Sequence, residues 1–70
     1  MLKEEAHQRI IEEWRKLPSA TRRTEQDAYL FCIRVRTEMP HLCDFRTRGD
    51  KHQVIMGWLR SDMEMTRGQV

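Results

Sequence analysis

Three stretches of the chain repeat their apolar residues at the three- and four-residue spacing of an amphipathic α-helix. The first stretch covers residues 2–17 and places its apolar side chains on one face: Leu2, Ala6, Ile10, Ile11, Trp14 and Leu17. Acidic residues near its start and basic residues near its end match the helix dipole. Pro18 follows, and the residue before a proline is disfavoured in the α region. The pattern therefore predicts a first helix over residues 2–17.

The second stretch covers residues 25–38 and is apolar on two sides. Thr24 is suited to cap its start, and Pro40 ends it. One side carries a stripe at heptad-like spacing: Ala28, Phe31, Cys32, Val35 and Met39. Tyr29, Leu30 and Ile33 lie on roughly the opposite side. A helix that is apolar on two sides either buries both or exposes one.

Two arrangements follow from this pattern, and the sequence leaves both open. The second helix sits centrally between the other two, or the side with Tyr29, Leu30 and Ile33 meets another chain. An exposed apolar patch on such a domain marks an interface. In the second arrangement we expect Arg34 and Arg36 at the rim to help set the register of the contact.

The third stretch predicts a helix over residues 51–63, with one broad apolar face: Val54, Ile55, Trp58, Leu59 and Met63. Residues 40–50 carry no helical period and form an irregular loop, which Leu42 and Phe45 should pin to the core. Residues 64–70 read as a frayed tail. The expectation is a single all-α domain over residues 1–70, built from three helices.

The charge balance is nearly neutral, with 13 Lys and Arg against 11 Asp and Glu, a formal net charge of +2. This gives only weak attraction to nucleic acid or anionic membranes. Basic residues nevertheless gather around the 46–52 loop and before the second helix: Arg22, Arg23, Arg46, Arg48 and Lys51. A nucleic-acid-binding accessory protein that uses this patch is the alternative function.

Four residues invite a metal or catalytic interpretation: Cys32, His41, Cys43 and His52. Structural zinc sites take ligands from tight C-x2–4-C knuckles, and these four residues do not have that spacing. A Cys–His pair also needs an orienting group and a pocket, for which 70 residues leave little volume. We expect no catalytic residues, no metal site and no cofactor.

No run of about 18 apolar residues occurs, so no transmembrane helix is expected. The polar, acidic start differs from a signal peptide, so the expected location is the cytoplasm with both cysteines reduced. The favoured function is a small non-enzymatic protein-interaction module. It self-associates or binds a partner protein through its second helix, at Tyr29, Leu30, Ile33, Arg34 and Arg36.

Overall fold

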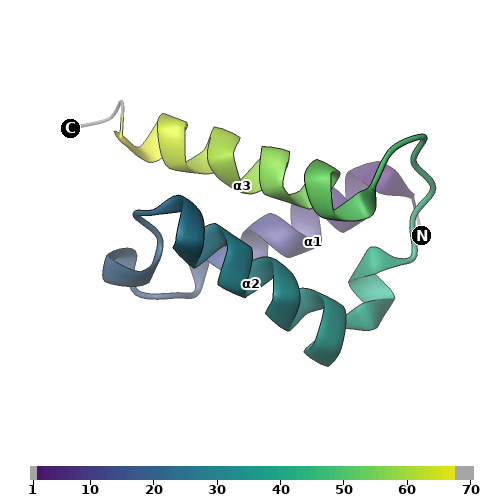
Figure 1. The fold of residues 1–70 in the computed structure, drawn as a ribbon, viewed down its shortest axis with the longest axis horizontal. Coiled ribbons are helices and arrows are strands. Elements are labelled where there is room, and N and C mark those ends of the chain that lie inside the picture. The colour runs from purple at the N-terminus through teal and green to yellow at the C-terminus, as the bar shows by residue number, and fades with distance from the viewer. Residues whose placement is uncertain (1, 68–70) are drawn as a thin grey trace.

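The computed structural model of the protein describes residues 2–67 and shows three α-helices. They are α1 (Lys3–Arg15), α2 (Glu25–Glu38) and α3 (Lys51–Arg67), joined by the short 3₁₀ turns η1 (Ser19–Thr21) and η2 (Pro40–Cys43). Consecutive helices run in opposite directions along the long axis (Figure 1). Residues 2–67 contain no strand, which confirms the predicted all-α, three-helix fold.

Helices α1 and α2 each pack more extensively against α3 than against one another. Helix α3 contacts both α1 and α2, while η2 packs against α1 and α2. Its buried residues Ile55, Met56 and Leu59 meet side chains from the other two helices: Ala6, Ile10, Trp14, Ala28, Phe31, Cys32 and Val35. Within residues 2–67, no element covers the side of α2 that carries Tyr29, Leu30 and Ile33, so the described part of the chain does not bury both sides of this helix.

The connection between α2 and α3 is held down as the sequence predicted. Leu42 and Phe45 are both buried at 3% exposure and belong to the core. Phe45 packs against Trp58 with ring centroids 5.3 Å apart, and the Lys51 ammonium lies over the Phe45 ring. The sequence did not predict the two 3₁₀ turns, because runs of three or four residues have no periodicity to detect.

The helix ends differ from prediction by a few residues at two places. Helix α1 ends at Arg15, because the N–H groups of Lys16 and Leu17 bond to carbonyls three residues back and tighten the last turn. Helix α3 continues to Arg67, so residues 64–67 of the predicted frayed tail are helical. The last three residues of that tail, 68–70, lie outside the described residues.

A polar contact lies within the packing of α1 against α3. The Asp62 side chain is buried at 5% exposure, and its Oδ1 accepts bonds from Arg15 Nε at 3.1 Å and Nη2 at 2.7 Å. Asp62 follows Ile55 and Leu59 at helical spacing, so it lies on the same buried face of α3. The ion pair therefore joins the C-terminal ends of α1 and α3.

Candidate interaction surface

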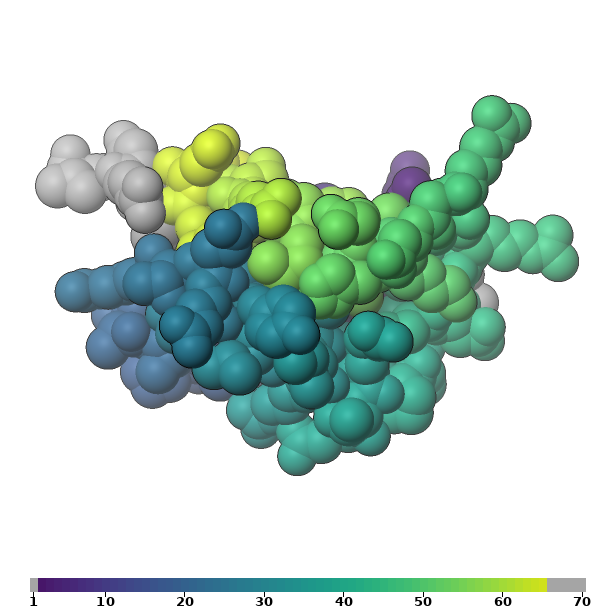
Figure 2. Space-filling view, viewed as in Figure 1, coloured from purple at the N-terminus to yellow at the C-terminus, as the bar shows by residue number. Residues whose placement is uncertain are grey.

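Helix α2 exposes the second apolar side that the sequence identified. Tyr29 is 48% exposed, Leu30 55% and Ile33 39%, although all three are large apolar residues. We call these three residues the outer face of α2. In the view of Figure 2, α2 lies toward the viewer and no other described segment passes over it. Within the described part of the chain, this face is left for solvent or for another molecule.

The opposite side of α2 is fully used in the core. Ala28, Cys32 and Val35 are 0% exposed, and Phe31 is 4% exposed. The Phe31 ring packs on Trp14 of α1 at a centroid distance of 5.1 Å. Helix α2 is therefore anchored on one side only.

Tyr29 is held in place by a contact from α3. Its ring meets the edge of the His52 ring at a centroid distance of 5.5 Å. His52 Nδ1 in turn lies 3.2 Å from the Sγ atom of buried Cys32. A contact chain thus runs from the core, through His52, to the outer face, and it restrains Tyr29 before any partner binds.

A shallow hollow lies beside Leu30. It has a volume of about 310 Å³ and is lined by Leu17 and Pro18 together with Asp27, Leu30 and Arg34 of α2. Most of its wall is apolar, and the two charged side chains stand at its α2 border. A protruding apolar side chain of another helix could enter here.

The two charges at this border are already oriented within α2. Asp27 forms a capping box with Thr24, in which Asp27 Oδ2 accepts bonds from the backbone N–H groups of Thr24 and Arg23, each at 3.2 Å. These bonds, first that from Thr24 and then that from Arg23, lower the pKa of the Asp27 carboxyl below its ordinary value. Asp27 is therefore a fixed carboxylate at neutral pH.

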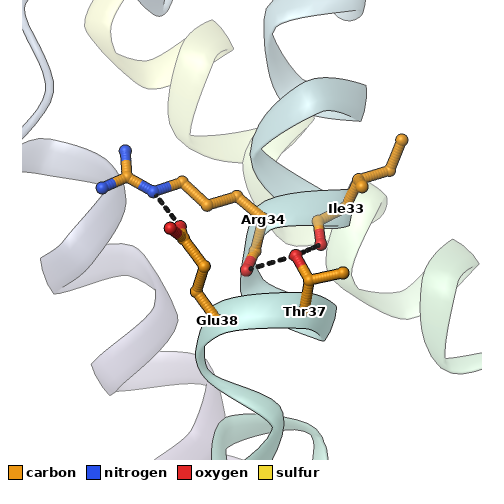
Figure 3. A network of polar contacts seen from close by, with 4 residues as sticks. All are labelled: Ile33, Arg34, Thr37 and Glu38. Carbon is orange, nitrogen blue, oxygen red and sulfur yellow. Dashed lines mark hydrogen bonds and ion pairs between the residues drawn. The ribbon is translucent and has the colours of Figure 1, made fainter.

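Arg34 is positioned one turn before the end of α2. Its Nε donates to Glu38 Oε2 at 2.6 Å, as Figure 3 shows. The two terminal nitrogens point away from Glu38 in the same view. Arg36 is exposed on the other flank of the outer face. Arg34 and Arg36 therefore lie on either side of the outer face.

The basic residues of the alternative function are divided between the two ends of the molecule. Arg22 and Arg23 lie between η1 and α2, whereas Arg46 and Arg48 lie in the connection before α3, and Lys51 is the first residue of α3, at the opposite end of the long axis (Figure 1). The single patch that combined both groups is not formed. The basic residues therefore form two separate groups, one of two residues and one of three.

The four metal candidates do not converge. Cys32 and His52 meet, but in the part of the chain that the structure describes, no three His, Cys, Asp or Glu side chains are placed to hold a metal ion. Burial raises the pKa of both the Cys32 and the Cys43 thiols. Since the thiolate is the reactive form, burial makes both side chains poorer nucleophiles.

Sequence reasoning missed two groups that shape this surface. The sequence gives no sign that His52 contacts Tyr29, yet the two rings lie against one another. Arg60 of α3 forms an ion pair with Glu25 at the start of α2, which fixes that end of the helix against α3. Each is an interhelical contact between residues far apart in the chain, so no local spacing could reveal it.

Comparisons of the chain with protein-family models, with curated proteins and with solved structures found no match. Across the described residues, no helix combines the length and apolar character needed to span a membrane. The geometry of α2 is therefore the main basis for a functional proposal.

Proposed function

We propose that this chain is a small, non-enzymatic protein-interaction module that binds another protein chain through the outer face of α2. The observation that carries the proposal is the exposure of Tyr29, Leu30 and Ile33 side by side on a helix whose other side is fully buried. Full burial of a completely exposed Leu or Ile side chain gains about 1.5–3 kcal/mol, and covering the exposed parts of Leu30 and Ile33 supplies a fraction of that gain.

The surroundings of the outer face also suit binding. Interfaces combine an apolar centre, rich in aromatic residues and Arg, with a polar rim. Here Tyr29 is restrained by His52, which reduces the ordering cost of association. Arg34 and Arg36 supply the rim. The raised pKa values of both thiols give no support to a cysteine-dependent enzyme.

The proposal can be tested by cross-linking in cells of the organism that encodes the chain. We compare the tagged wild type with the double variant L30Q/I33Q and with L2Q/M65Q, which changes two apolar residues outside α2 that are more exposed than Leu30 and Ile33. The proposal predicts a cross-linked protein, which could be the chain itself, that is lost with L30Q/I33Q and retained with L2Q/M65Q. Identical products from all three chains would contradict it.

The second candidate function is nucleic-acid binding by the exposed residues Arg46, Arg48 and Lys51, which lie in the connection before α3 and at its first residue. Three basic residues support at most a weak, strongly salt-dependent contact. A gel-shift assay with duplex DNA at low salt tests this candidate, using an R46Q/R48Q variant as the comparison. If the wild type causes no shift, the candidate is eliminated.

A further inference from the structure

The outermost residues of α2 form a narrow row along the helix. Gln26, Leu30, Ile33 and Thr37 are all exposed and are separated by four, three and four residues. This spacing is that of the residues at a coiled-coil seam, which keeps side chains in line along a neighbouring helix. The row therefore suits contact with one straight helix rather than with a flat surface.

A neighbouring helix can cover both ends of the row without leaving a buried polar group unpaired. The Thr37 hydroxyl already donates to the carbonyl oxygen of Ile33 at 2.8 Å (Figure 3). Thr37 can therefore be buried without losing a hydrogen bond to water. Gln26, at the other end of the row, is long enough to keep its amide at the rim.

The flanks of the row are complementary to themselves when two copies pair in antiparallel orientation. A seam of this kind places Leu30 opposite Ile33 of the second copy, and Gln26 opposite Thr37 of the second copy. In that register the flanking residues on one side are Asp27 and Arg34, which have opposite charges. Each Asp27 then faces the second copy's Arg34, and the symmetry forms this pair twice.

The other flank of the row matches in the same register. Tyr29 of one copy faces Arg36 of the second copy, where a guanidinium can lie over the aromatic ring. In a parallel pairing, Asp27 and Arg36 would each face a residue that lies beyond the end of the second copy's α2. Neither would then have a partner. The antiparallel pairing uses both residues twice.

We infer that the occupant of the outer face is a second copy of this chain, with the two α2 helices paired antiparallel. The two-fold axis crosses the outer face at the level along the helix that lies midway between Leu30 and Ile33. The inference rests on the proposed function and specifies its partner. Backbone N–H groups hold Asp27 as a carboxylate, and Arg34 uses only its Nε on Glu38, which leaves its two terminal nitrogens available to a carboxylate of the second copy.

The size of the contact sets its strength. Helix α2 has 14 residues and is therefore about 21 Å long. One helix pair of this length belongs to the small class of interfaces, below about 1,200 Å² in total. The dimer should accordingly dissociate in the micromolar range, and its charged flank pairs should weaken as salt is raised.

The test uses purified full chains and a pair of charge reversals. Both R34E and D27K should dimerise at least about tenfold more weakly than the wild type, because each homodimer then contains two like-charged pairs. An equimolar mixture of R34E and D27K should regain dimers, since the heterodimer contains one original and one reversed pair. Sedimentation measures the affinities, native mass spectrometry identifies the heterodimer, and R9E is the control for the charge change of R34E.

A second measurement determines the register of the two helices without changing the capping box of Thr24 and Asp27. A photoreactive residue at position 26, in a mixture of isotope-labelled and unlabelled chains, should cross-link to the α2 C-terminal end, around Thr37, of the other copy. Cross-links between the two residues at position 26 would instead indicate parallel pairing and overturn the register. This readout remains valid if D27K does not fold.

The outcomes separate this inference from the proposed function. A wild-type chain that stays monomeric up to millimolar concentration overturns the homodimer, even if Leu30- and Ile33-dependent cross-linking to a different protein in cells upholds the proposed function. A dimer that L30Q/I33Q leaves intact overturns the inferred pairing. Single reversals that weaken the dimer without recovery on mixing overturn the antiparallel register.

Discussion

The two sides of α2 carry similar apolar side chains and have different roles. On the inner side, Phe31 and Val35 lose nearly all contact with water by packing on α1 and α3. On the outer side, Leu30 and Ile33 retain 55% and 39% of their exposure. Apolar side chains stabilise a folded or associated state when they are removed from water. The inner side therefore stabilises the monomer, whereas the outer side contributes mainly when a second chain covers it. Hydrophobicity alone does not distinguish them; position around the helix does.

The largest expected effect comes from emptying the inner side. Phe31→Ala removes a ring that packs on Trp14 and leaves a cavity, which costs about 3–5 kcal/mol. A domain of this size has only a few kcal/mol of stability, so the variant should be largely unfolded. Circular dichroism with urea titration measures the loss. Cooperative unfolding at the wild-type midpoint would contradict the assignment of this side to the core.

The next largest effect concerns the ion pair between Arg15 and Asp62. Arg15→Ala removes two bonds to the buried Asp62 carboxylate and should lower the free energy of unfolding by about 1–2 kcal/mol, a value reduced because Arg15 itself is exposed. Arg9→Ala, at an exposed position in the same helix, is the control. Equal stability of the two variants would show that the Asp62 contact contributes nothing.

Gly57→Ala tests an exposed side of α3 that the paired α2 helices leave uncovered. A Cβ at Gly57 meets no atom within 4 Å, so alanine should raise stability by up to about 1 kcal/mol through helix propensity alone. Association should not change, because this side lies outside the inferred contact. A weaker dimer in sedimentation would place Gly57 within the interface and enlarge it beyond α2.

The smallest effect is that of pH on the start of α2. The pKa of Asp27 is lowered in the folded chain from its ordinary value of 3.8, so its contribution to stability is complete above that value. The contribution is lost as the pH falls from about 4 through the lower folded pKa. Asp27→Asn should therefore be less stable than the wild type at pH 7, and this difference should shrink in unfolding experiments at pH 3. A constant difference would argue against the cap.

The parts of the fold that depend on local spacing were predictable. The apolar stripes indicated all three helices, Thr24 and Pro40 bounded the second, and the two-sided pattern of α2 identified Tyr29, Leu30 and Ile33 as exceptional. The choice between a central and a peripheral α2 was not predictable. It depends on which sides of α2 the other two helices cover, which is a long-range property.

The other features that the sequence did not predict also depend on long-range contacts. The burial of Asp62 is visible in its spacing from Leu59, but its partner Arg15 is on another helix. The division of the basic residues between two ends follows from the antiparallel path of the chain, not from the charges themselves. The contact between His52 and Tyr29 joins α3 to α2, and no spacing within either helix indicates it.

The most direct test of the difference between the two sides is thermal unfolding at increasing protein concentration. The wild-type midpoint should rise with concentration, because dimerisation stabilises only the folded chain. The L30Q/I33Q variant should show a midpoint independent of concentration and, in dilute solution, should match the wild type within about 0.5 kcal/mol. A concentration-independent wild type, or a variant as unstable in dilute solution as Phe31→Ala, would contradict the separate roles of the two sides of α2.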